Sequence, residues 1–109
     1  MIRIDRVMLA VEPLDMRCGV ETAIGRVVKT YGKAEPHYAY IFLNKRANRM
    51  KVLIHDGFGV WLAARRLNSG KFSGPQTWHK DPMSLSQSQV DALIMGLPWK
   101  YAGQSINQV

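Results

Sequence analysis

Apolar residues occur along the chain in four short runs that predict β-strands. The runs are residues 6–11 (RVMLAV), 39–43 (AYIFL), 50–54 (MKVLI) and 60–67 (VWLAARRL). The first three are rich in β-branched or aromatic residues, as strands usually are. The fourth also fits a short helix, but the glycines around it and the turn sequence SGKFSG that follows favour a strand.

Between the first two runs, apolar residues recur at the three- and four-residue spacing of one helical face. Asp15 is placed to cap this helix and Gly32 to end it. The apolar face consists of Met16, Val20, Ala23, Ile24, Val27, Val28 and Tyr31. The pattern therefore predicts a helix between the first strand and the second.

A second helix is predicted near the C-terminus. Ser86 and Gln89 form an S-x-x-Q capping box, in which each side chain binds the backbone N–H of the other residue. Leu85 and Val90 have the spacing of a hydrophobic staple. The rest of the apolar stripe is Leu93, Ile94 and Leu97. The residues that stop the helix are Gly96 and Pro98.

The second and third strands are expected to pair as an antiparallel hairpin, because only the turn-rich loop NKRANR separates them. Asn44 and Asn48 in this loop tolerate the left-handed conformation that hairpin loops often need. The hairpin places Lys45, Arg46 and Arg49 at one loop tip.

These elements predict an α+β fold, an antiparallel β-meander of three to five strands flanked by two helices. Residues 1–101 are expected to form a single domain. Within it, residues 73–83 are expected to be a loop. Residues 102–109 are expected to be a loose C-terminal tail.

The net positive charge of the chain lies in its middle third. The whole chain carries 15 Lys and Arg against 8 Asp and Glu, for a formal net charge of +7. Residues 1–39 hold six cations and five acids, and residues 81–109 hold one cation and two acids. Residues 40–80 hold eight cations against Asp56 alone, so the whole excess lies there. Such a block favours a polyanionic partner over a surface that is basic only for solubility.

Composition narrows the class of protein further. The chain is 47% apolar over 109 residues, which suffices for one modest core. No apolar run approaches the roughly 20 residues of a membrane span. Asp5 and Arg6 stand where a signal peptide would have its hydrophobic region. The single cysteine, Cys18, excludes an internal disulfide and a multi-cysteine metal site. We therefore expect a cytoplasmic protein with no membrane partner.

Candidate catalytic residues are few, and each has a simpler explanation. Cys18 lies near a helix start, which can lower a thiol pKa, but it has no histidine beside it in the sequence. His55 and Asp56 resemble a base and its orienting acid, yet Asp56 begins an Asp-Gly turn. His37 and His79 lack metal-ligand spacing. No phosphate-binding glycine motif is present. We predict no catalytic residues, no metal site and no cofactor.

Aromatic residues are interleaved with the basic block, which suits nucleic acid because phosphates meet the charges and bases can stack on the rings. The rings are Tyr38, Tyr40, Phe42, Phe58, Trp61, Phe72 and Trp78. We expect Phe42 and Trp61 to lie in the core of the sheet instead. No helix-turn-helix, zinc-finger or RNP pattern is present, so no base-sequence readout is predicted.

Five stretches of the chain resemble the Orf2-like accessory protein of insertion-sequence family 66, often called TnpB and distinct from the RNA-guided nuclease of that name. They are VEPLDMRCG (11–19), FLNKRANRMKVL (42–53), DGFG (56–59), RRLNSGKF (65–72) and LSQSQVDALIMGLPW (85–99). They occur in order and without large gaps. The chain departs from the family's pattern at Cys18, at His55 and in the stretch SGPQTWH after Phe72.

The resemblance implies a non-catalytic helper of transposition, encoded by a bacterial mobile element and acting beside a separate transposase. We expect it to bind DNA, either transposon ends or DNA in general, and so to be associated with the nucleoid. The predicted DNA-binding residues are Lys45, Arg46, Arg49, Lys51, Arg65, Arg66 and Lys71. The alternative is a protein adaptor, in which the same surface docks the transposase or another accessory subunit without touching DNA.

Overall fold

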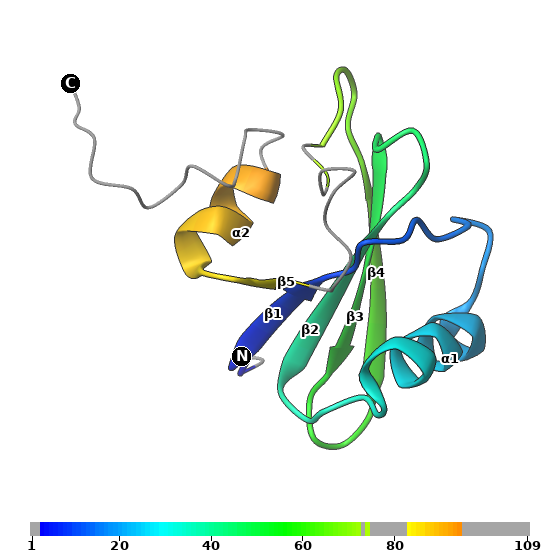
Figure 1. The fold of residues 1–109 in the computed structure, drawn as a ribbon, viewed down its shortest axis with the longest axis vertical. Helices are drawn as coiled ribbons and strands as arrows, with labels where there is room; N and C mark the ends of the chain where they lie inside the picture. The colour runs from blue at the N-terminus through cyan, green and yellow to red at the C-terminus, as the bar shows by residue number, and fades with distance from the viewer. Residues whose placement is uncertain (1–2, 73, 75–82, 95–109) are drawn as a thin grey trace.

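The computed structural model describes residues 3–72, 74 and 83–94 of the chain. The elements are β1 (Arg6–Leu9), α1 (Val20–Tyr31), β2 (Tyr38–Leu43), β3 (Arg49–His55), β4 (Val60–Arg66), β5 (Met83–Leu85) and α2 (Gln87–Ile94). The strands form one five-stranded sheet in the order β4-β3-β2-β1-β5 (Figure 1). Neither helix in these residues is long and apolar enough to cross a membrane.

The α+β class is confirmed, but the sheet is mixed rather than a purely antiparallel meander. β2, β3 and β4 form the predicted antiparallel hairpins. β1, however, runs parallel to β2, and β5 runs antiparallel to β1. The cause is α1, because a helix that crosses between adjacent strands returns the chain in its original direction. β5 begins at Met83, in the stretch predicted as a loop, because a three-residue strand is too short to show a period.

Each face of the sheet is covered by a different helix (Figure 1). β2 is buried on both faces, because its alternate side chains enter two separate cores. The core beside α1 contains Ala10, Leu14, Ala23, Val27, Tyr40, Phe42 and Leu53. The core beside α2 contains Leu9, Ile41, Leu43, Met50, Phe72, Leu85, Val90 and Leu93.

Trp61 is not the core residue that the sequence predicted. Phe42 is fully buried as expected, but Trp61 is 54% exposed. Trp61 lies on β4 at one edge of the sheet, whereas α2 packs near β5 at the other edge. Its indole Nε1 donates a hydrogen bond to Asp56 Oδ2 at 2.8 Å, so the polar end of the ring is satisfied at the surface.

The predicted start of α1 is also corrected. The helix begins at Val20, and its N-cap is Gly19, which has no side chain to cap it. Asp15 instead accepts hydrogen bonds from the backbone N–H and the guanidinium of Arg17, at 2.9 and 2.7 Å. A carboxylate held in this local turn cannot also cap a helix four residues later.

The capping box at α2 is confirmed. The backbone N–H of Ser86 donates to Gln89 Oε1 at 2.9 Å, and that of Gln89 donates to Ser86 Oγ at 3.2 Å. Leu85 and Val90, the predicted staple, belong to the same core. The predicted stop of this helix and the predicted C-terminal tail lie outside the described residues.

Candidate nucleic-acid interface

The loop between β2 and β3 is braced by its two asparagines. Asn44 Oδ1 accepts hydrogen bonds from the backbone N–H groups of Asn48 and Arg49, both at 3.0 Å. Asn44 Nδ2 donates to Asn48 Oδ1 at 2.7 Å. The left-handed residue is Ala47, with φ of 58°, rather than either asparagine. The asparagines therefore serve the loop by hydrogen bonding.

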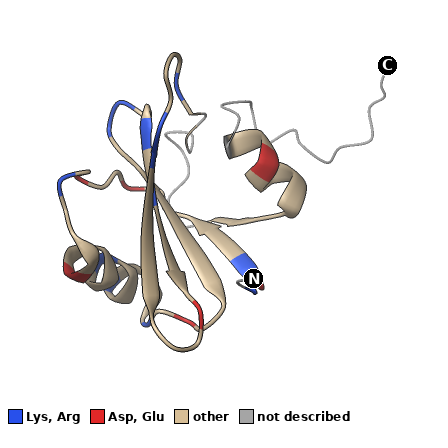
Figure 2. Cartoon of the chain, turned by 180° about the vertical axis from the view of Figure 1, so that it is seen from behind, with Lys and Arg blue, Asp and Glu red and all other residues tan. Residues whose placement is uncertain are grey.

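Two backbone hydrogen bonds attach this loop to the segment that follows β4. Leu67 donates to the carbonyl of Asn48 at 3.0 Å, and Phe72 donates to that of Ala47 at 2.6 Å. Basic residues far apart in the sequence therefore meet at one end of the sheet, as Figure 2 shows. They are Lys45, Arg46 and Arg49 of the hairpin, Arg65 and Arg66 of β4, and Lys71 of the segment that follows β4.

The hairpin loop forms one wall of the site. Residues 13–17, between β1 and α1, form a second wall. Backbone hydrogen bonds from Ala10 and Leu14 to carbonyls of β2, both at 2.9 Å, hold this segment beside the sheet. Lys51 Nζ donates to the carbonyl of Cys18, the residue directly after this segment, at 2.6 Å and so attaches the end of the segment to β3. Lys51, predicted to bind DNA, is half-buried and has this structural contact, whereas the other six predicted residues are exposed.

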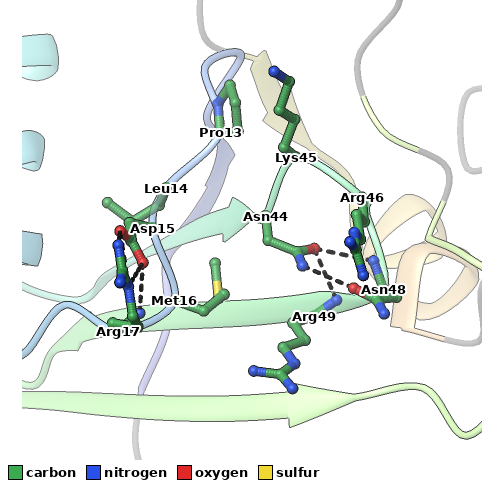
Figure 3. Close-up of a pocket in the computed structure, with 10 residues that line it drawn as sticks. All are labelled: Pro13, Leu14, Asp15, Met16, Arg17, Asn44, Lys45, Arg46, Asn48 and Arg49. Atoms are coloured by element: carbon green, nitrogen blue, oxygen red, sulfur yellow. Dashed lines mark hydrogen bonds and ion pairs between the residues drawn. The ribbon is translucent and has the colours of Figure 1, made fainter.

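An open cavity of about 790 Å³ lies between the two walls (Figure 3). Its lining residues are Pro13, Leu14, Asp15, Met16, Arg17, Asn44, Lys45, Arg46, Asn48 and Arg49. A smaller hollow of about 310 Å³ adjoins it, because Met16 and Arg49 line both. The other residues of the smaller hollow are Met50, Lys51, Ala64, Arg65 and Arg66. We call the two hollows together the basic groove.

The positive charge of the basic groove is little offset by acids. Among its described lining residues, Asp15 is the one carboxylate. Arg17 binds it at 2.7 Å, and hydrogen bonds from the Arg17 side chain and backbone lower the pKa of Asp15 to about 2. Asp15 is therefore ionised at neutral pH, and its charge is already matched by a neighbour.

Arg49 and Arg66 lie directly opposite each other on β3 and β4. Like charges at opposite positions destabilise an antiparallel pair. The ion pairs among the described residues are Arg3–Asp5, Arg17–Asp15 and Lys33–Glu35, so neither arginine has an acidic partner there. An anion bound between the two guanidinium groups would relieve their repulsion and accept hydrogen bonds from both.

Two of the candidate catalytic side chains, Asp56 and His55, stabilise the turn between β3 and β4. Asp56 accepts hydrogen bonds from the backbone N–H groups of Phe58 and the following glycine and from Trp61 Nε1, all at 2.8 Å. These bonds, led by the one from Phe58, lower the pKa of Asp56 to about 2. His55 Nδ1 accepts a hydrogen bond from the backbone N–H of Gly57 at 3.0 Å. Over residues 3–72, 74 and 83–94, no three His, Cys, Asp or Glu side chains gather as metal ligands.

Replacing Asn44 with alanine is expected to lower the free energy of unfolding by about 1–2 kcal/mol, because two backbone N–H groups of the loop lose their acceptor. Urea denaturation followed by circular dichroism would measure the loss. Lys45→Ala, an exposed change in the same loop, is the control and should stay within about 0.5 kcal/mol of the wild type. Equal stability of the two variants would show that Asn44 does not brace the loop.

Comparison with known proteins identifies relatives along most of the chain. The sequence model of a family described as IS66 Orf2 like protein matches residues 5–104. Uncharacterized protein y4jC of Sinorhizobium fredii is 32% identical over 97 residues, which cover 86% of this chain and 80% of that protein. Uncharacterized protein y4hO of the same organism is 30% identical over 98 residues, which cover 88% and 84%. No solved structure matches.

Proposed function

This chain belongs to the IS66 Orf2-like family, a membership that indicates an accessory role in transposition, and we propose that it fills this role by binding the phosphate backbone of DNA in the basic groove. The observation that carries the proposal is the opposed pair Arg49 and Arg66, which has no acid beside it among the described residues. Guanidinium groups match the geometry of phosphate oxygens, and a phosphodiester backbone presents such oxygens at regular intervals.

The proposed ligand is duplex DNA of any sequence. Stacking on single-stranded bases needs exposed rings, and none lines the described part of the groove. Tyr40, Phe42 and Phe72 are buried in the cores, whereas Phe58 and Trp61 belong to the turn and strand start at the far end of β4. The proposed role is non-catalytic, with strand cleavage and joining left to a separate transposase.

A salt series tests the proposal. Fluorescence anisotropy would measure the affinity of the wild-type protein for a labelled duplex, with an insertion-sequence end and a random sequence compared at each salt concentration. If five of the exposed cations meet phosphates, the slope of log K against log salt should be roughly −4 to −5, at about −0.9 per contact. The two duplexes should bind with similar affinity.

The rival function is a protein adaptor, in which the basic surface docks an acidic patch on the transposase or another subunit. It predicts little DNA binding at any salt concentration and a protein partner whose capture depends on apolar anchors. A wild-type protein that binds neither duplex at low salt would contradict our proposal and favour the adaptor.

A further inference from the structure

The two edges of the sheet differ in how well they are protected. β5, at one edge, has only three residues. β4, at the other edge, has seven residues and pairs with β3 along its whole length without a bulge. Its first five residues, VWLAA, contain no charge and no proline. Edge strands of soluble proteins are normally protected by short length, a bulge, a charge or a proline, because unpaired backbone groups recruit further strands.

The hydrogen-bonding pattern shows which backbone groups of β4 point outward. Asp56 donates to the carbonyl of Gly59, and Leu67 donates to that of Asn48, so these bonds enclose the β3–β4 ladder at its two ends. Hydrogen-bonded pairs alternate with non-bonded pairs in an antiparallel ladder. Counting alternate pairs inward from either of these terminal bonds gives the same result. The backbone groups of Trp61, Ala63 and Arg65 form hydrogen bonds with β3. The outward-facing residues are Val60, Leu62, Ala64 and Arg66.

We propose that two copies of the chain pair through β4, antiparallel and around a twofold axis at Ala63. This register places Val60 opposite Arg66 and Leu62 opposite Ala64, so all four outward-facing residues of each copy are paired. A shift of two residues in either direction leaves one of them without a partner. The product is one continuous sheet in which each copy contributes its five strands.

The side chains of β4 are compatible with the same register. No cation faces a cation, because Arg65 lies opposite Trp61 and Arg66 opposite Val60. Ala63 meets its own copy at a non-bonded pair, where strands approach most closely and a small side chain fits. Pairing also covers part of Trp61, which is 54% exposed in the single chain.

Over residues 3–72, 74 and 83–94, the fold leaves this edge accessible. α1 packs over β3 and α2 packs near β5, so neither described helix lies along the outer edge of β4. Strand pairing takes place in the plane of the sheet and leaves its faces open. The two basic grooves would then lie at opposite ends of the joined β4 strands, and the pairing does not depend on what those grooves bind.

Disulfide cross-linking tests the register. In a Cys18→Ser background, Ala63→Cys should give a covalent dimer on mild oxidation, because the two Cα atoms are about 4.5 Å apart in a non-bonded pair. Ala64→Cys is the matched control, because Ala64 is also exposed and lies on the same strand. Its two copies are offset by two residues, about 6.8 Å along the strands, which exceeds disulfide reach once the strand separation is added. Equal cross-linking of the two variants would overturn the proposed register.

The mass in solution tests the pairing itself. Sedimentation equilibrium of the wild type should show a concentration-dependent rise from one chain mass toward two. Ala64→Pro removes an outward N–H without breaking the ladder to β3, and a folded protein of single-chain mass is expected. A wild type that stays at single-chain mass at its highest soluble concentration would overturn the proposal. So would an Ala64→Pro variant that is folded and still dimeric.

Discussion

Replacing Lys45, Arg46 and Arg49 together with alanine is expected to reduce DNA affinity by roughly 100- to 1,000-fold at 0.1 M salt, since each lost phosphate contact removes about 0.9 from the log-log slope and 0.1 M lies one decade below the 1 M reference. The slope itself should become shallower by about 2 to 3 units. The fold should persist, because all three side chains are exposed and the loop is held by Asn44 and by backbone bonds.

A matched triple variant separates local contact from net charge. Arg6, Lys29 and Lys33 are exposed and lie outside the basic groove, so changing them to alanine removes the same three charges. That variant should keep most of the wild-type slope. Equal losses in the two variants would mean that DNA responds to overall charge, and unchanged affinity in the groove variant would remove the loop from the interface.

Replacing Leu53 with alanine is expected to lower the free energy of unfolding by about 3 kcal/mol, within the range for fully buried leucines. Leu53 is completely buried in the core beside α1, and its cross-strand neighbours are Tyr40 and Leu62. A loss of this size should lower the melting temperature by roughly 10–20 °C. Thermal and urea unfolding followed by circular dichroism would measure it.

Leu62→Ala serves as the comparison for Leu53→Ala. Leu62 belongs to the same layer but lies on the edge strand and is only half-buried, so its loss should cost about 1 kcal/mol. A Leu53→Ala variant destabilised by less than Leu62→Ala would contradict the packing of α1 against the centre of the sheet.

The local parts of the fold could be predicted from the sequence. The β2–β3 hairpin was predicted because its strands are separated only by a short loop, and loop length largely sets the register of such pairs. The α2 capping box was predicted because its partners are three residues apart. The proximity of the hairpin cations to Arg66 followed from a third strand joined by another short turn.

The long-range parts could not be predicted in the same way. The parallel pairing of β1 and β2 depends on how α1 packs, and no local period encodes it. The helix start was misplaced because Arg17, rather than the helix, takes the carboxylate of Asp15. Arg17 also lines the basic groove although it lies in the near-neutral N-terminal part of the sequence, but its charge there is offset by Asp15.

Lys51 shows the opposite error of charge counting. It belongs to the basic block of the sequence, but the structure uses its ammonium group to hold the carbonyl of Cys18. Formal charge does not reveal whether the ammonium group of a lysine already has a hydrogen-bond partner within the protein. Among the predicted DNA contacts, Lys51 is therefore the one whose replacement should disturb the wall formed by residues 13–17 as well as the charge of the groove.

Chemical-shift mapping is the most direct test of where DNA binds. A ¹⁵N-labelled protein would be titrated at low salt with a short duplex of random sequence, and each backbone amide would be followed. We expect the largest shifts at residues 14–17, 44–51 and 64–67, with little change at the Phe58 turn at the far end of β3 and β4. Shifts centred on that turn, or none on the basic groove while the duplex is bound, would contradict this expectation.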